Sequence, residues 1–270
     1  MSRPRNFEAF SFNLVMTLLA VLALTLVIAP SLVVVIVSFT SGFSLKFPPP
    51  GYSMRWYVEL WNAWQLQFAA RNSLIVAAWA TGLSVAFGVA AALAISGSKS
   101  LSARLLDSLF MSPLVLPALA FGLAALMFFS LIGMQVSLLT LVIGHTIVCV
   151  PYVVRNTVAA LTQLEPTLLE SSAVLGASRL YTFRRIVLPL IRPGIISGAF
   201  IAFMSSFDNV PVSLFLRDAA TDMLPIRMWQ DLEGKLDVTI AALSSVLIIA
   251  TVALMAIMER STGLSKRLTG

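Results

Sequence analysis

The chain has 270 residues, of which 59% are hydrophobic and only 11% are charged. Soluble domains carry about 25% charged residues, so too few polar groups remain here to cover a water-facing surface, and lipid must be the solvent. The net charge of +6 does not indicate a nucleic-acid partner, because the basic residues are dispersed between long apolar runs. The single cysteine, Cys149, lies within an apolar run and can form neither an internal disulfide nor a metal cluster.

The first apolar run, residues 14–37, is expected to be a membrane span and not a cleaved signal peptide. It is longer than the roughly 7–15 residues of a signal-peptide core, and no convincing small-residue cleavage site follows it. At about 1.5 Å per residue this run extends roughly 36 Å, which exceeds the ~30 Å thickness of a hydrocarbon core.

Five further stretches pass the same test, at about residues 73–96, 112–131, 136–154, 193–214 and 238–258. Between Asp107 and Arg155 no charged residue occurs apart from the weakly ionisable His145, and Gly133-Met134-Gln135 divides that stretch into two spans. A backbone in lipid must satisfy its own hydrogen bonds, so the spans are helices. The sequence therefore predicts an all-α membrane protein with six transmembrane helices, organised as a single domain over residues 1–270.

The distribution of lysine and arginine predicts that both termini lie in the cytosol. With the N-terminus inside, twelve basic residues fall in inner segments and six in outer segments, as the positive-inside rule requires. The inner residues are Arg3, Arg5, Lys99, Arg104, Arg155, Arg179, Arg184, Arg185, Arg192, Arg260, Lys266 and Arg267. The outer residues are Lys46, Arg55, Arg71, Arg217, Arg227 and Lys235.

The inner loop that joins the fourth and fifth spans predicts two short helices. Pro166 suits the first turn of the first helix, and Ser178 suits the N-cap of the second. Ala173, Gly176 and Ala177 have the i, i+3, i+4 spacing of one helix face, and such small side chains let another surface approach the backbone. By geometry alone, the loop is either an amphipathic connector on the membrane surface or a docking element. The second helix has an apolar stripe of Leu180, Phe183 and Ile186.

This loop, at about residues 156–192, resembles the EAA loop of type I ATP-binding cassette (ABC) importer permeases. In that family a Glu-Ala-Ala triplet is followed after three residues by glycine, and later by Ile-x-Leu-Pro. Ser171 and Ser172 stand in place of the alanine pair, which exchanges one small residue for another. The residues that match the pattern are Glu170, Gly176, Ala177, Ile186, Leu188 and Pro189.

The resemblance implies a MetI-like permease fold with five core helices and one peripheral helix, facing a second permease subunit across the pore. It also implies a bacterial cytoplasmic (inner) membrane, two ABC ATPase subunits, an extracytoplasmic solute-binding protein and alternating access. The loop would form a coupling helix that docks in a groove of the ATPase. The expected ATPase-coupling residues are Glu170, Ala173, Gly176, Ala177, Phe183, Ile186, Leu188 and Pro189.

The sequence carries no nucleotide-binding motif of its own. Gly-x-x-x-x-Gly-Lys-Ser/Thr is absent, and the nearest run, Gly97-Ser98-Lys99-Ser100, lacks glycine directly before lysine. We therefore expect a non-catalytic subunit without a cofactor, whose partner subunits bind ATP and magnesium. The alternatives from other classes are an ion-gradient secondary transporter and a membrane scaffold; the small-residue docking face and the scarcity of carboxylates inside spans argue against them.

Four further segments are similar to the polyamine-importing branch of the family, at residues 47–57, 71–73, 112–117 and 206–215. Relatives in that branch handle putrescine, spermidine, opine-like or aminophosphonate compounds, so the expected solute is a polyamine or a related small amine. Other small solutes, including anions, stay open because the binding protein sets most of the selection. The branch also implies that the second permease is a different chain.

Asp208 is the one acidic residue inside a predicted span. A carboxylate at the centre of a span costs roughly 2.5–3.5 kcal/mol on insertion scales, so it should face protein or water. Asn209 and Pro211 beside it would open the helix locally and expose polar backbone. Asp208 and Asn209 are therefore candidates for the translocation path of a cationic solute; the alternative is a structural role, such as a helix cap.

Other conspicuous residues have structural interpretations. His145 is expected to be a hydrogen-bonded interhelical residue and not a pathway residue. Pro113, Pro117 and Pro151 interrupt predicted spans and mark either hinges or permanent kinks. An outer aromatic cluster forms either an interfacial belt or a partner surface, and consists of Trp56, Tyr57, Trp61 and Trp64.

Overall fold

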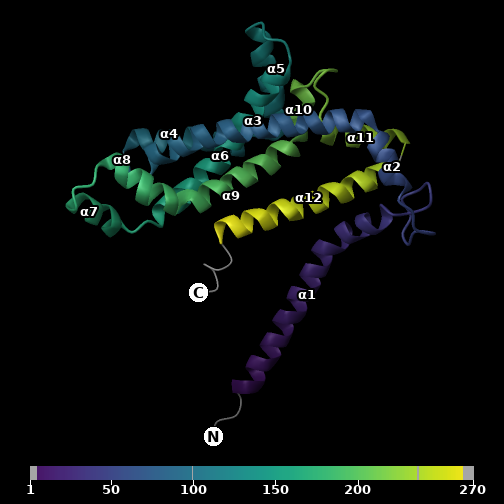
Figure 1. Cartoon of the computed structure of the whole chain (residues 1–270), viewed down its shortest axis with the longest axis horizontal. Coiled ribbons are helices and arrows are strands. Elements are labelled where there is room, and N and C mark those ends of the chain that lie inside the picture. The colour runs from purple at the N-terminus through teal and green to yellow at the C-terminus, as the bar shows by residue number, and fades with distance from the viewer. Residues whose placement is uncertain (1–4, 99, 236, 264–270) are drawn as a thin grey trace. The chain divides into compact units, whose positions relative to one another are not determined.

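The computed structural model describes residues 5–98, 100–235 and 237–263, most of them in helices (Figure 1). The basic residues Arg3, Lys99, Lys266 and Arg267, which entered the orientation count, lie outside these residues. In chain order the elements are α1 (Arg5–Val37), α2 (Arg55–Asn62), α3 (Trp64–Ile95), α4 (Leu101–Val115), α5 (Ala118–Leu131), α6 (Leu138–Thr162), α7 (Pro166–Val174), α8 (Arg179–Thr182), the π-helix η1 (Phe183–Val187), α9 (Leu188–Phe207), α10 (Val210–Leu216), α11 (Leu224–Lys235) and α12 (Thr239–Thr262).

Within the described residues, five helical stretches are long and apolar enough to cross a membrane, and a sixth span results if the bent pair α4–α5 counts as one. Four of the predicted spans lie along single long helices and are confirmed as helices. These are residues 14–37 on α1, 73–96 on α3, 136–154 on α6 and 238–258 on α12.

The third predicted span, residues 112–131, is wrong as one straight helix. The chain breaks between α4 and α5, which are bent by 106°. Leu116 has extended backbone, with ψ of 140°, because the ring of Pro117 disfavours the helical conformation in the residue before it. Pro117 also lacks the N–H that would continue the helix. Pro113 and Pro151, in contrast, lie inside α4 and α6, which continue through them.

The fifth predicted span, residues 193–214, is also broken. Helix α9 ends at Phe207, and Asp208 and Asn209 lie between it and α10. The expectation that Asp208 occupies a helix interior is therefore wrong, although the helix does open beside it as predicted. At membrane depth, non-helical backbone is tolerated only where it is buried in protein or lines a water-filled cavity. This break is consequently a candidate functional position.

The chain divides into two compact units, Met1–Ala63 with Asp231–Val252 and Trp64–Gln230 with Ala253–Gly270. The first unit contains α1, α2 and the first part of α12, and the second contains α3 to α10. Each unit has its own packed side chains, described separately below. The single-domain organisation expected from the sequence stays a prediction.

In the first unit, the aromatic cluster divides into buried and exposed members. Trp56 on α2 is buried against Val238 and Ala242, and its indole N–H donates to the carbonyl of Thr40 at 2.9 Å. Trp61, at the end of the same helix, is 81% exposed. Trp56 is therefore a core residue of this unit, and only the exposed members can serve as an interfacial belt or a partner surface.

In the second unit, the long helices α3, α6 and α9 pack against one another. At Gly194 on α9, an added β-carbon would lie 2.6 Å from the Ala160 side chain and 2.7 Å from the Asn156 carbonyl oxygen of α6. Membrane helices associate through such small residues, because lipid provides no hydrophobic driving force between them. Gly82 on α3 has no such neighbour within 4 Å.

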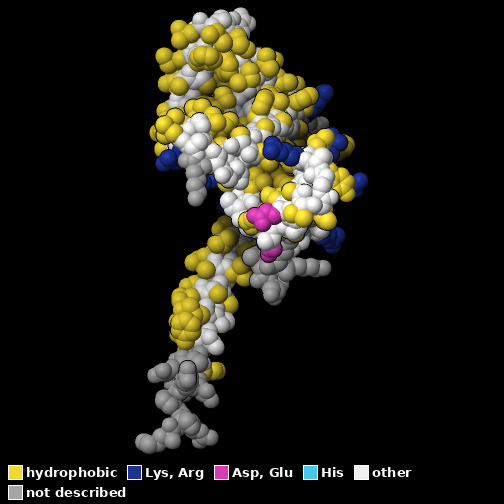
Figure 2. Space-filling view, turned by 90° about the vertical axis from the view of Figure 1, so that its left-hand side faces the viewer, with side chains coloured by type: hydrophobic (Ala, Val, Ile, Leu, Met, Phe, Trp, Pro, Cys, Tyr) yellow, Lys and Arg dark blue, Asp and Glu magenta, His cyan; other side chains and the backbone are white. Residues whose placement is uncertain are grey.

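Hydrophobic side chains dominate the face of the molecule that Figure 2 shows, and charged side chains are few. Helix α1 is the clearest example, since Leu26 and Val27 are 67% and 74% exposed. Water-soluble monomers rarely expose contiguous apolar surface on this scale. The prediction of an all-α membrane protein is confirmed.

Replacing Gly194 with leucine is expected to force α6 and α9 apart, because the new side chain meets backbone that cannot rotate away. Overpacking costs about 1–3 kcal/mol, so the thermal unfolding midpoint of the purified protein in detergent should fall by several degrees. Gly82→Leu is the matched control, since the same change meets open space there. An equal loss of stability in both variants would contradict the packing role of Gly194.

Candidate functional site

The segment between α6 and α9 contains two short helices joined by a tight turn. Pro166 lies in the first turn of α7, where its missing N–H is not needed. Helix α7 ends in a Schellman motif: the N–H of Ala177 donates to the carbonyl of Ser172 at 3.1 Å, and the N–H of Gly176 donates to that of Ala173 at 3.0 Å. Gly176 has a φ of +75°, a conformation that costs residues with a β-carbon roughly 1–2 kcal/mol.

The second short helix begins at the predicted N-cap. The hydroxyl of Ser178 accepts a hydrogen bond from the backbone N–H of Tyr181 at 3.3 Å. The hydroxyls of Ser172 and Thr182 are 2.7 Å apart and join α7 to α8. From α8 the chain continues through η1 into α9 without a break. This continuity fixes the position of α8 and η1 relative to the start of α9. We call α7, α8 and η1 together the α7–α8 segment.

The small-residue helix face expected in this segment does not form. Ala173 lies in the last turn of α7, but Gly176 and Ala177 lie beyond the end of the helix, because Gly176 adopts the left-handed conformation. The exposed surface of the turn is formed instead by Val174 and Leu175, which are 86% and 85% exposed. These two residues were not among the predicted coupling residues. The available signal was a pair of apolar residues directly before a helix-terminating glycine.

The remaining residues expected to couple to the ATPase lie along the same stretch. Glu170 is exposed on α7, Phe183 and Ile186 are half-buried in η1, and Leu188 and Pro189 are exposed at the start of α9. All the predicted coupling residues therefore belong to one continuous stretch of chain. Their role in docking stays a prediction.

At the other end of α9 lies the break at Asp208. Helix α9 has 20 residues, which at about 1.5 Å each amounts to roughly 30 Å. Asp208 is exposed, and within the part of the chain that the structure describes its carboxylate has no hydrogen-bond or ion-pair partner. The side-chain oxygen of Asn209 accepts from the N–H of Val212 at 3.0 Å and so caps α10. Asn209 thus has a structural role, whereas the Asp208 carboxylate is available to a ligand.

The short helix α10 packs against α5, the helix that follows the other break. At Gly122 on α5 an added β-carbon would lie 2.8 Å from the carbonyl oxygen of Pro211. Val212 and Leu216 of α10 are completely buried and share a hydrophobic cluster with Phe129 of α5. The two helices that follow breaks are therefore packed on each other.

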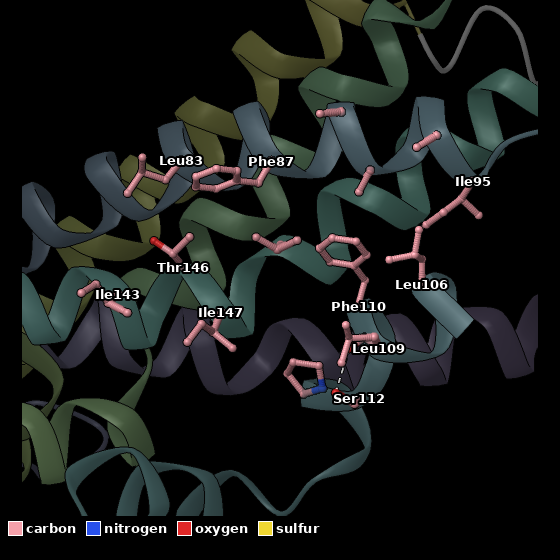
Figure 3. Close-up of a pocket in the computed structure, with 15 residues that line it drawn as sticks. Leu83, Phe87, Ile95, Leu106, Leu109, Phe110, Ser112, Ile143, Thr146 and Ile147 are labelled. Atoms are coloured by element: carbon pink, nitrogen blue, oxygen red, sulfur yellow. Dashed lines mark hydrogen bonds between the residues drawn. The ribbon is translucent and has the colours of Figure 1, made fainter. Parts of the chain in front are cut away.

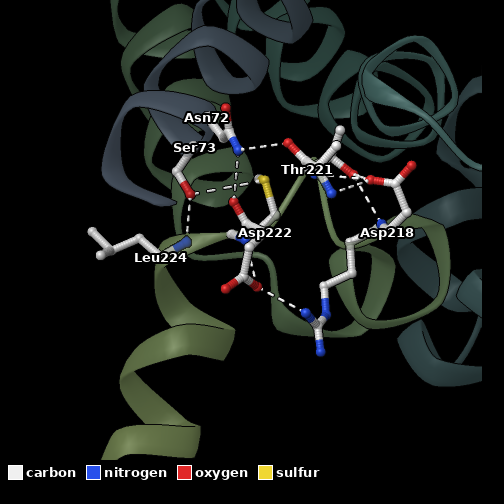
Figure 4. A network of polar contacts seen from close by, with 9 residues as sticks. Asn72, Ser73, Asp218, Thr221, Asp222 and Leu224 are labelled. Atoms are coloured by element: carbon white, nitrogen blue, oxygen red, sulfur yellow. Dashed lines mark hydrogen bonds and ion pairs between the residues drawn. The ribbon is translucent and has the colours of Figure 1, made fainter. Parts of the chain in front are cut away.

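A polar network ties the loop after α10 to helix α3 (Figure 4). The side-chain amide of Asn72 donates to the carbonyl of Asp222 at 3.1 Å, and the hydroxyl of Ser73 accepts from the N–H of Leu224 at 2.9 Å. Within the loop, Arg217 forms an ion pair with the carboxylate of Asp222 at 2.8 Å. The network holds the far end of α10 in place, and it gives Asn72 and Ser73 a structural role.

An apolar groove of about 740 Å³ lies between α3, α4 and α6 (Figure 3). Leu83 and Phe87 of α3 and Phe110 of α4 line it, and its only side-chain hydroxyls are those of Ser112 and Thr146. Among the described residues that line it, none has a charged side chain. These residues therefore offer no partner to an ammonium group, and removing an ion from water is costly unless the ion is paired.

The short helix α7 precedes the candidate span Arg179–Phe207, and that span ends at the break that presents the Asp208 carboxylate. This organisation suits a membrane transport subunit. The family described as binding-protein-dependent transport system inner membrane component matches residues 84–267, and the chain belongs to this family. The expected type I ABC importer permease is therefore confirmed.

Similar proteins cover most of the chain. The spermidine/putrescine transport system permease protein PotC of Haemophilus influenzae is 27% identical over 236 residues, which cover 86% of this chain and 90% of that protein. The putrescine transport system permease protein PotI of Escherichia coli is 29% identical over 234 residues, which cover 84% of this chain and 83% of that protein.

Solved structures share the fold at lower identity. A bacterial ABC transporter involved in the import of the acidic polysaccharide alginate matches with a TM-score of 0.72 and 14% identity, over 96% of this chain and 98% of that chain. The MetNI methionine ABC transporter in inward-facing conformation matches with a TM-score of 0.62 and 17% identity, over 74% of this chain and 96% of that chain. The predicted MetI-like fold is thereby confirmed.

Replacing Gly176 with valine is expected to disrupt the turn after α7, because a β-branched residue is strained at positive φ. Trypsin should then cleave the purified protein faster at the exposed Arg184 and Arg185, which lie in η1. Gly176→Asn is the control, since asparagine tolerates the left-handed conformation, and should be cleaved at nearly the wild-type rate. Equal cleavage of wild type and Gly176→Val would show that the turn does not require glycine.

Proposed function

We propose that this chain is the membrane-embedded permease subunit of an ATP-driven, binding-protein-dependent importer of polyamines or related small amines. The observation that carries the proposal is the continuous path from the α7–α8 segment through α9 to the break at Asp208. An ATPase that moves the segment would move α9 with it, and the helix would carry that displacement to the Asp208 carboxylate. No bond is made or broken in this chain.

The docking surface proposed for the ATPase is the turn that exposes Val174 and Leu175. Val174 and Leu175 are adjacent, apolar and exposed at the end of α7, and an exposed apolar patch favours contact with a partner. In the proposed transporter, this chain associates with two ABC ATPase subunits. It also associates with a second permease subunit, which is a different chain. ATP and magnesium would be bound by the ATPases alone, and this chain would hold no cofactor.

The orientation that fits this arrangement has both termini in the cytosol. The α7–α8 segment then faces the ATPases, and the break at Asp208 lies towards the outer side of the bacterial inner membrane, where an extracytoplasmic binding protein delivers the solute. The excess of inner lysine and arginine residues supports this direction.

An amine is the solute class that Asp208 supports best. A carboxylate without a partner in the chain can replace part of the hydration that an ammonium group loses on leaving water. The relatives PotC and PotI, whose names specify spermidine and putrescine, support the same class. Family membership in turn favours ATP-driven import over an ion-gradient mechanism.

Replacing Leu175 with aspartate is expected to release the ATPase, because a charge would be buried in an apolar interface. Interface hot spots cost about 2 kcal/mol or more when removed, so the affinity for the ATPase should fall roughly thirtyfold or more, and less ATPase should co-purify with the tagged permease. Leu175→Met is the matched control, since it keeps an apolar side chain of similar size, and should retain the ATPase. Full retention with aspartate would exclude this turn from the interface.

Spermidine or putrescine, presented with the cognate binding protein, is expected to stimulate ATP hydrolysis by the complete transporter in lipid. An opine, an aminophosphonate and a small anion serve as the comparison solutes. Stimulation only by one of these would keep the transporter class and reject the amine. Failure of any ATPase to co-purify under mild conditions would contradict the ATP-driven mechanism itself.

In the same assay, Asp208→Asn should raise the spermidine concentration for half-maximal stimulation while leaving the bound ATPase unchanged. The matched control is Glu233→Gln, which removes the same charge from an exposed position on α11. An unaltered response of the Asp208 variant would remove this carboxylate from the solute path.

A further inference from the structure

His145 on α6 joins the two helices on either side of the break at Asp208 and Asn209. Its side chain is completely buried. The ring Nδ1 lies 2.8 Å from the hydroxyl of Ser206 on α9, and Nε2 lies 3.1 Å from the hydroxyl of Ser213 on α10. A neutral imidazole has one donor and one acceptor nitrogen, and a serine hydroxyl can act as either. One side chain therefore forms hydrogen bonds to both sides of the break.

The residue before His145 brings α10 close enough for this bridge. At Gly144 an added β-carbon would lie 2.6 Å from a methyl carbon of Leu216 and 3.0 Å from one of Val212. Both of these α10 side chains are completely buried. Helix α10 thus lies directly against the backbone of α6, and His145 reaches from there to Ser206 on α9.

We propose that His145 is a positioning residue that fixes the angle between α9 and α10, and with it the shape of the opening at Asp208. Packing against α5 and α6 sets the position of α10, and the bridge adds the polar contacts that tie both sides of the break to one side chain. Without these contacts the angle between α9 and α10 is less tightly fixed. The inference rests on the proposed function only in placing Asp208 on the solute path. The bridge itself does not depend on which solute is carried.

The direct test is the distance across the break, measured by electron paramagnetic resonance on the complete transporter in lipid without solute. Spin labels at Ile201→Cys on α9 and Leu214→Cys on α10 replace side chains that are 39% and 47% exposed. The native Cys149 is completely buried and stays unlabelled. His145→Leu should broaden the distance distribution relative to the labelled wild type, and Ser213→Ala should do the same without changing the volume of the ring site.

Two further substitutions separate the two hydrogen bonds. The carboxamide of glutamine occupies the position of Nε2, so His145→Gln keeps the bond to Ser213 and loses the bond to Ser206. The carboxamide of asparagine occupies the position of Nδ1, so His145→Asn keeps the bond to Ser206 and loses the bond to Ser213. Because the bridge requires both bonds, both variants should show a broader distance distribution than the wild type. A purely structural role predicts instead that both amides lower the unfolding midpoint and leave the distance distribution narrow.

The functional readout is spermidine-stimulated ATP hydrolysis. Loss of one of its two hydrogen bonds, as in Ser213→Ala, should raise the concentration of spermidine for half-maximal stimulation roughly fivefold, with the maximal rate nearly unchanged. A wild-type distance distribution in both His145→Leu and Ser213→Ala overturns the proposal. A broad distribution with an unchanged half-maximal concentration also overturns it. If the solute is not an amine, the distance measurement alone decides, so failure of the proposed function and failure of the bridge are distinguishable.

Discussion

In an apolar solvent, every backbone N–H and C=O must find its partner within the chain. The long helices meet this requirement by themselves, and the departures from helix are the places where something else must satisfy the backbone. At the break after α9, Asn209 caps α10 with its side chain. At Pro117 the missing N–H removes one of the groups that would need a partner. Each of the two breaks, at Pro117 and at Asn209, is thus made tolerable by a specific residue.

The class of fold could be predicted from the sequence, because long uncharged runs in a chain of this composition allow only membrane helices. The sequence was also sufficient for the position of the α7–α8 segment, since Pro166 and Ser178 signal helix starts by local chemistry. It was insufficient for the bend at Pro117, because Pro113 and Pro151 carry the same local signal and remain inside helices. Which proline breaks a helix depends on tertiary packing that local sequence does not encode.

The same limit explains what was missed at the candidate site. Helical spacing placed Gly176 on one face with Ala173. In the structure, α7 ends at Val174, and Gly176 with its positive φ lies beyond the end of the helix. An interhelical role for His145 was predicted from its apolar surroundings and agrees with the structure. Its two partners, Ser206 and Ser213, lie more than sixty residues away, and no pattern within the sequence pairs them.

Helix α9 separates the proposed docking segment from the Asp208 carboxylate by about 30 Å. No side chain belongs to both sites. Substitutions at the break can therefore change which solute is accepted without altering the surface that meets the ATPase. Conversely, the turn at Val174 and Leu175 can adapt to another ATPase without changing the solute path. An ancestral chain with this layout could diversify its cargo while keeping one motor, because the two specificities are under separate selection.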